Sequence, residues 1–415
     1  MTDGVGPRSR GARAAGSFRR VAAVLEIDAR LLAMFAVLAA IAVGFEFATG
    51  GFFLTARNLF NLSLQTSVVA IMATGMVLII VSRHIDLSVG SMMGLAGMFA
   101  AVFQVWVFPV GAGYNWIVTL LICIAFGALL GAFQGYWIAY RALPSFIVTL
   151  AGLLAWRGAS WLISGGVTIS PMDETFQKLG GGLEGTIGET WSWVVGGLGI
   201  IGIVFFFVQS RLRKQRYGFR VRPLAVELAL IAVACAAVVG FVMTMNAYLH
   251  PIRKTPQGIP IPVLILIVIV IVMSLVARIT RFGRYVYAMG GNPEAAELAG
   301  IDVKKMTLYI FIISGILCAI AGSVSIARLN ASPTSLGQLA ELNVIAAAVI
   351  GGASLSGGVG TVAGAILGAL IMQSLQNGML LMGITSAIQQ MVSAGVLLLA
   401  VWFDVVYQKR RLLVR

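Results

Sequence analysis

The chain has 415 residues, of which 59% are hydrophobic and only 11% are charged. A soluble domain needs more polar surface than this composition provides, so the sequence excludes a soluble globular protein and indicates several membrane-spanning helices. The net charge of +14 could suggest nucleic-acid binding. Lysine and arginine, however, concentrate between the apolar runs, as expected for cytoplasmic loops of a membrane protein. We therefore predict contact with membrane lipid and no nucleic-acid partner.

A series of continuous apolar runs follows along the chain. Because their hydrophobicity does not alternate, a β-barrel is excluded and an all-α polytopic membrane protein with about 10–12 spans is predicted. Alternating these spans puts the basic segments on one side, which places both termini in the cytoplasm. One run, residues 343–352, is too short to cross alone. The predicted spans are residues 31–48, 66–82, 89–108, 116–139, 145–164, 191–209, 224–245, 261–277, 307–328, 343–352, 359–379 and 387–407.

Residues 1–30 are predicted to be a cytoplasmic tail, as are residues 408–415 at the other end. Residues 31–407 would then form one transmembrane domain. The first apolar run lacks a small-residue cleavage site and is interpreted as a retained span. Residues 50–65 are expected outside the cell membrane as a short amphipathic helix in the interface. The interfacial side chains would be Phe52, Phe53, Leu59 and Phe60.

The first polar motif reads IDLSVGS over residues 85–91. Asp86 is an acid between two spans, and Ser88 allows irregular backbone to satisfy its hydrogen bonds locally. Such backbone at membrane depth needs protein or a wet cavity around it, so both residues are candidates for a translocation pathway. The alternative is that Asp86 only caps the next helix. A glycine-rich segment at residues 351–364 echoes this motif, which predicts that 343–352 is a half-helix ending inside the protein.

Further polar residues interrupt later spans. Arg157 lies within a predicted span and is expected to face protein or water along the pathway, although snorkelling to the outer interface is an alternative. Gln373 and Asn377 lie in or just after another apolar run. Amides in a span either bond a neighbouring helix or meet a polar solute, so these two residues are also pathway candidates.

Two spans within residues 191–245 are joined by a strongly basic segment and predict a hairpin of helices. Several basic residues are expected on the exterior, against the general charge bias. They are interpreted as a docking surface for an acidic partner protein, and ordinary solvated surface is the alternative. These residues are Arg57, Arg253, Lys254 and Arg328.

The longest polar interruption in the second half covers residues 277–306. Asn292 can cap a helix whose first residue is Pro293, and Glu294 lies near the positive end of its dipole. Gly300 supplies the left-handed residue that ends it. A helix of two turns with small side chains suits docking into a groove, whereas a plain surface turn is the alternative. The residues assigned to docking are Asn292, Pro293, Glu294, Ala295, Ala296 and Gly300.

These motifs, in this order, resemble those of bacterial ABC importer permeases of the monosaccharide and branched-chain amino acid branch. The run GGNPEAAELAGI resembles the EAA-and-glycine signature of their coupling helix, which docks on a separate ATPase subunit. IDLSVGS and PSFIVTL resemble motifs of sugar permeases, which adds Phe146 and Thr149 to the pathway candidates. The hairpin over residues 191–245 resembles an insertion found in xylose-type members. Asn343 departs from the family, since an aspartate is common there.

The resemblance implies a type II importer-like permease fold, a permease homodimer, an ABC ATPase subunit and a periplasmic sugar-binding protein. The predicted function is inward translocation of a monosaccharide, D-xylose or a related sugar, across the inner membrane. The sequence contains no Gly-Lys dipeptide and hence no P-loop, so ATP hydrolysis is assigned to the partner. No catalytic residue, metal or cofactor is expected. The alternatives are an ion-coupled secondary transporter using Asp86, Arg157 or Glu46, and a membrane assembly factor.

Overall fold

The computed structural model describes residues 29–108, 111, 113, 115–219 and 221–413. Over these residues the regular structure is helical, with isolated β-bridges in the connections. Ten of the described helices are long and apolar enough to cross a membrane, which confirms the predicted all-α polytopic fold. The predicted tail of residues 1–30 lies outside the described residues except for its last two positions.

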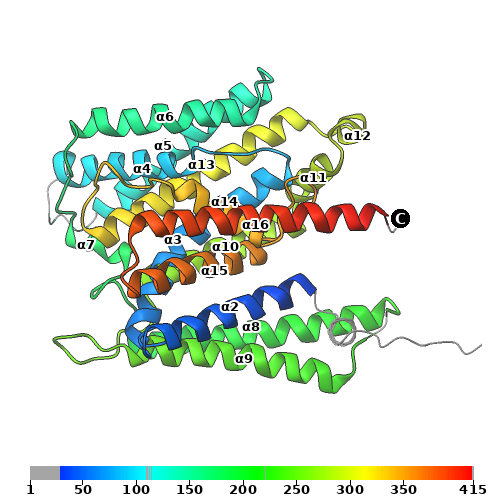
Figure 1. Cartoon of the computed structure of the whole chain (residues 1–415), viewed down its shortest axis with the longest axis horizontal. Helices are drawn as coiled ribbons and strands as arrows, with labels where there is room; N and C mark the ends of the chain where they lie inside the picture. Colours follow the sequence, from blue (N-terminus) through cyan, green and yellow to red (C-terminus); the bar gives the residue numbers. More distant parts are fainter. Residues whose placement is uncertain (1–28, 109–110, 112, 114, 220, 414–415) are drawn as a thin grey trace, which may run out of the picture.

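The spanning helices run side by side, and α11, α12 and the last turns of α16 lie at the same end of the bundle (Figure 1). This common end is the predicted cytoplasmic side. The spanning helices are α2 (Ala29–Ala48), α3 (Ala56–Val81), α4 (Val89–Val102, continued by the π-helix Phe103–Val107), α5 (Asn115–Ala139), α6 (Ser145–Ser164), α8 (Gly188–Arg216), α9 (Leu224–Ala247), α10 (Ile261–Ile279), α13 (Val303–Leu329) and α15 (Val362–Leu381). The other helices are α7 (Glu174–Gln177) with the 3-10 turn Lys178–Gly180, α11 (Arg281–Gly291), α12 (Pro293–Leu298), α14 (Ala340–Ile350) and α16 (Ser386–Leu413).

Helix α13 lies at the centre of the bundle and packs against α3, α4 and α5. Its contact with α5 is so close that main chains touch: a Cβ added to Gly131 would lie 2.2 Å from the carbonyl oxygen of Phe311, and one at Gly127 would lie 2.4 Å from that of Gly315. Lipid tails are as apolar as side chains, so close packing of small residues holds such helices together. The α5–α13 contact therefore fixes the centre of the fold.

Helix α3 is longer than predicted and begins at Ala56. Phe53 and Phe60 are 1% and 2% exposed, so the expected interfacial helix at residues 50–65 is wrong over most of its length. The side chain of Asn58 donates to the carbonyl of Phe53 at 2.8 Å, which satisfies a polar group inside the protein. Polar residues at the start of α3 made it look like a surface segment, although they are bonded within the bundle.

Helix α14 is short, as predicted. Leu339, just before it, has the left-handed φ of 59°, and Glu341 packs against Gly90 at the start of α4. The helix ends at the buried Gly351 beside Gly364, where α15 begins, and Ala353 just beyond it is 1% exposed. The end of this short helix is therefore buried within the protein, in agreement with the expectation.

The predicted hairpin is present as α8 and α9, which pack on each other at the edge of the bundle (Figure 1). Only 11% of each spanning window is buried, compared with 94% for α3. Arg211 of α8 forms an ion pair with Glu227 of α9, which links the two helices near their cytoplasmic ends. That the α8–α9 hairpin is an insertion into a shorter fold stays a prediction.

We predict that a single methyl group at Gly131 destabilises the core of the helical bundle. In Gly131→Ala the new atom meets the backbone of α13, so the two helices must move apart. This overpacking should cost about 1–3 kcal/mol and lower the melting temperature in detergent by several degrees. Gly158→Ala is the control, since nothing lies within 4 Å of the added atom. Equal melting temperatures for the two variants would contradict the close α5–α13 contact.

Candidate functional site

Two adjoining cavities, of about 770 and 270 Å³, lie among α14, α15, α16, the middle of α3 and the end of α13. They share Gln376 and Gln389, and we call them together the amide cleft. Their size falls in the range of small-molecule sites. The amide side chains that line the cleft are Gln65, Gln338, Asn343, Gln373, Gln376, Asn377, Gln389 and Gln390.

Hydrogen bonds order the amides that come from α15. Gln373 Nε2 donates to Gln376 Oε1 at 3.0 Å, and Gln376 Nε2 donates to Asn343 Oδ1 of α14 at 2.8 Å. Asn377 Oδ1 accepts from Asn58 Nδ2 of α3 at 2.8 Å. Residues three and four apart share one helix face, which is why these side chains gather on one side of α15. Each amide has two donor hydrogens and two acceptor sites. The row of amides formed by Gln373, Gln376 and Asn343 therefore keeps donors and acceptors that could bond a solute.

Of the described residues that line the amide cleft, only Arg328 is charged. Its Nε atom is buried and has no hydrogen-bond partner among the described residues. The sequence analysis predicts that Arg328 belongs to an exterior docking surface. In the structure Arg328 instead lines the smaller cavity with Gln373 and Asn377. A cleft with many amides and one cation suits an uncharged solute rich in hydroxyl groups.

Asp86 and Ser88 lie in a separate polar cluster at the start of α4. Asp86 is fully buried, and its Oδ1 atom accepts from the backbone N–H of Ser88 at 2.8 Å and from its hydroxyl at 2.6 Å. Gln134 Nε2 of α5 donates to Ser88 Oγ at 2.8 Å, and Thr149 Oγ1 of α6 donates to the carbonyl of Ile85 at 3.3 Å. Ser88 is the N-cap residue of α4 and its side chain makes no capping bond, so Asp86 orders the turn before the helix and does not itself cap α4. None of these residues lines the amide cleft.

Arg157 faces the bundle from α6. Its Nη2 atom is buried without a hydrogen-bond partner among the described residues, and Arg157 interacts electrostatically with Glu341 of α14. Glu341 is 4% exposed and was missed by the sequence analysis, although an acid at the head of the apolar run ELNVIAAAVI was a visible signal. Phe146, on the same helix as Arg157, is 52% exposed on the outside of the bundle. The structure therefore separates these residues from Gln373 and Asn377.

Three of the four predicted docking residues lie on the surface. Arg57 and Lys254 are exposed, and Lys254 adopts a left-handed φ of 55° in the turn between α9 and α10. Arg253 forms an ion pair with Glu184 at 3.0 Å, so its charge is partly neutralised from within the chain. Arg57 and Lys254 thus offer more of their charge to a partner than Arg253 does.

Helix α12 begins at Pro293, as predicted, and ends at Leu298, one residue before the predicted end at Ala299. The side chain of Asn292 accepts from the N–H of Ala295 at 3.1 Å, and Gly300 has a φ of 83°. Ala296 is 5% exposed and faces the bundle, whereas Leu298 is 91% exposed. The side chain of Leu298 is therefore accessible at the end of the bundle that carries α11 and α12.

Asp302 follows this helix and caps α13. Its carboxylate accepts from the N–H of Lys305 at 3.0 Å and pairs with the Lys305 ammonium at 3.1 Å. The hydrogen bonds from Lys305 hold the pKa of Asp302 below its ordinary value. Both ends of the segment that carries α12 are therefore fixed by local caps.

Comparison with known proteins identifies the family. The model of the branched-chain amino acid transport system permease component matches residues 58–401. The chain belongs to this family. The permease is 43% identical to the xylose transport system permease protein of Haemophilus influenzae, over 92% of this chain and 98% of that protein.

More distant members match over less of their length. The xylose transport system permease protein of Escherichia coli K12 is 41% identical over 92% of this chain and 94% of that protein. The ribose import permease protein of the same strain is 33% identical over 85% of this chain and 87% of that protein. No solved structure matches. Family membership and the ten apolar helices make the permease a multi-pass protein of the bacterial inner membrane, as predicted.

We predict that the amide cleft is open to water. A cysteine replacing Asn343 should react with a small polar thiol reagent, because this position lines the larger cavity. A cysteine replacing its neighbour Val344, which is 0% exposed, should not react. Both variants are made with Cys235 changed to serine, since the other two native cysteines are buried. Labelling is measured by mass spectrometry, and equal rates at the two positions would contradict an open cleft.

Proposed function

We propose that this permease is the membrane-spanning subunit of an ATP-driven importer that carries D-xylose or a closely related monosaccharide into the cell. The proposal is supported by the identity to two xylose transport system permease proteins, 43% and 41%, against 33% to a ribose import permease protein. The amide cleft is the observation that carries it. A neutral sugar needs hydroxyl-matching groups along its passage and little charge.

The row of Gln373, Gln376 and Asn343 offers the sugar several weak binding positions, one after another in space. Each amide donates and accepts, so hydroxyl groups of the solute replace water without leaving a polar group unpaired. Passage requires binding that is favourable enough to enter and weak enough to leave, and separate single hydrogen bonds meet this condition better than a charged site. Arg157 and the cluster around Asp86 would then support the helices beside the cleft rather than contact the sugar.

The energy for transport would come from a separate ATPase subunit bound at α12. Support for this role comes from the exposure of Leu298 and from the absence of a P-loop in the sequence. A periplasmic sugar-binding protein would dock near Arg57, Arg253 and Lys254, and a second copy of the permease would complete the transporter. Movement of α12 on ATP binding would switch the side of the membrane to which the cleft opens.

Reconstitution tests the proposal. The permease is placed in proteoliposomes with its ATPase and binding protein, and uptake of labelled D-xylose and D-ribose is measured with and without ATP. We expect ATP-dependent uptake with preference for D-xylose. Uptake driven by an ion gradient without the ATPase would instead identify a secondary transporter, and no uptake with every partner present would favour an assembly factor.

We predict that Gln376→Leu slows D-xylose uptake by up to tenfold, because it removes one hydrogen-bonding position worth roughly 0.5–1.5 kcal/mol. The leucine keeps the approximate volume, so the fold should persist. Gln215→Leu, at the exposed end of α8, is the control and should transport normally. Normal uptake by Gln376→Leu at equal membrane expression would remove the amide cleft from the pathway.

A further prediction concerns α12. Leu298→Asp replaces the exposed apolar side chain by a charge and should prevent stable co-purification of the ATPase, while the permease still inserts and folds. Glu297→Gln, the adjacent exposed position, should retain the ATPase. ATPase bound equally by both variants would place the docking surface elsewhere.

A further inference from the structure

Three segments that are far apart in the sequence meet at the cytoplasmic end of the bundle. They are the turn after α3, the last residues of α11, and the glycine-rich loop of residues 351–361 between α14 and α15. We call their contact the glycine junction. It lies directly before Asn292, the residue that begins α12, and is formed by Val81, Arg83, Gly290, Gly291, Gly357 and Gly358.

The side chain of Arg83 joins the first two segments. Its Nε atom donates to the carbonyl of Gly290 at 2.7 Å, and its Nη2 atom donates to that of Gly291 at 2.5 Å. These carbonyls end α11, so they lack partners within the helix and carry the negative end of its dipole. A planar guanidinium bonded at two points fixes both the position and the orientation of the helix end.

The main chains of the three segments touch directly. A Cβ at Gly290 would lie 1.9 Å from the carbonyl oxygen of Val81 and 2.8 Å from the nitrogen of Gly358. A Cβ at Gly357 would lie 2.4 Å from Cγ of Arg83. The N–H of Gly358 donates to the carbonyl of Val81 at 2.8 Å. Because no flexible side chain separates these backbones, displacement of one segment must displace the others.

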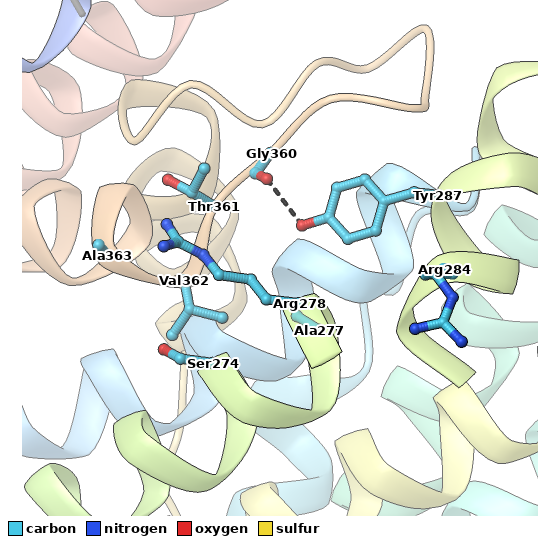
Figure 2. A pocket seen from close by; sticks show the side chains of 9 residues that line it. All are labelled: Ser274, Ala277, Arg278, Arg284, Tyr287, Gly360, Thr361, Val362 and Ala363. Atoms are coloured by element: carbon cyan, nitrogen blue, oxygen red, sulfur yellow. Dashed lines mark hydrogen bonds between the residues drawn. The ribbon is translucent and has the colours of Figure 1, made fainter. Parts of the chain in front are cut away.

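A second bond joins α11 to the same loop. The hydroxyl of Tyr287 donates to the carbonyl of Gly360 at 2.7 Å, beside a cavity of about 420 Å³ (Figure 2). The loop is preceded by α14, which carries Asn343, and followed by α15, which carries Gln373 and Gln376. Both helices that supply the central row of amides are therefore connected through this loop to the end of α11.

The backbone of Arg83 supports a specific role for its side chain. Its φ of 66° is left-handed, a conformation that a residue with a Cβ seldom adopts. A cytoplasmic arginine that only enforced membrane topology would need neither this conformation nor two bonds to main-chain carbonyls. The strained backbone persists because the surrounding contacts hold it in place.

We propose that Arg83 is the positioning residue through which a movement of α12 reaches the amide cleft. A partner that displaces α12 moves Asn292 and the end of α11. Arg83 then carries that displacement to the end of α3, and the loop moves with it, so that α14 and α15 shift and the cleft changes its exposure. This inference rests on the proposed function, because it requires an ATPase on α12.

The test compares Arg83→Gln and Arg83→Lys with wild-type permease in proteoliposomes that contain the ATPase and binding protein. Sugar transported and ATP hydrolysed are measured together. We expect Arg83→Gln to retain the ATPase and to hydrolyse ATP, but to transport at least tenfold less sugar per ATP. Lysine preserves the charge without the two-point contact, so Arg83→Lys should also fall below wild type. A purely electrostatic role predicts full rescue by lysine.

A pair of glycine substitutions provides a matched control in which Arg83 itself is not replaced. Gly290→Ala introduces a methyl group into the junction, whereas at Gly291 nothing lies within 4 Å of an added Cβ. Both changes have the same effect on helix propensity, so only the first should lower sugar transported per ATP. An unchanged ratio in Arg83→Gln and Gly290→Ala, with wild-type transport driven by ATP, would overturn this inference alone. Absence of ATP-driven uptake in the wild type would instead overturn the proposed function.

Discussion

In the interior of a membrane, helices gain little by burying apolar side chains, because lipid tails are equally apolar. Contact between main chains, made possible by glycine, therefore carries much of the cohesion of this permease. Gly127 and Gly131 bring α5 against α13, and Gly351 and Gly364 bring the end of α14 against the start of α15. At these four positions even one added methyl group would meet the facing backbone, so the contacts oppose rotation or sliding of one helix on the other.

The polar groups of the bundle fall into two sets, one in closely packed regions and one beside a cavity. Asp86 and the pair Arg157 and Glu341 lie where helices pack closely. Asp86 Oδ1 accepts two hydrogen bonds from Ser88, whereas Arg157 Nη2 and Glu341 Oε2 are buried without a hydrogen-bond partner among the described residues. The amides of α15 instead face a cavity bounded by the loosely packed α16, most of whose described side chains are exposed or half-buried. Glu341 thus packs against α4, whereas Asn343, on another face of the half-helix α14, lines the cavity.

Much of the fold could be predicted from the sequence, because apolar runs and caps are local signals. The helix from Pro293 to Leu298 follows from Asn292 and Gly300 alone, and its structure agrees with that prediction. The start of α3 was missed because Asn58 looks polar in sequence yet is bonded inside the bundle. Local signals do not tell which helices will be neighbours.

The site was harder to predict for the same reason. Gln373 and Asn377 could be selected as polar residues within an apolar run, but their partners Asn343 and Asn58 belong to other helices. Arg328 looked exterior because it stands near the end of a span, although its guanidinium turns inward. Glu341 was overlooked since one acid beside an apolar helix resembles an ordinary terminus. In each case the tertiary contact, rather than the residue type, decides the role.

Asn292 ends α11 and begins α12, so the two helices share a single capping residue and have no linker between them. A free hinge would need at least one residue whose backbone dihedrals could change without breaking a bond. Here any change in the angle between the helices removes the cap of α12. Helices α11 and α12 are therefore expected to turn together, so that a force applied to α12 acts as a torque on α11.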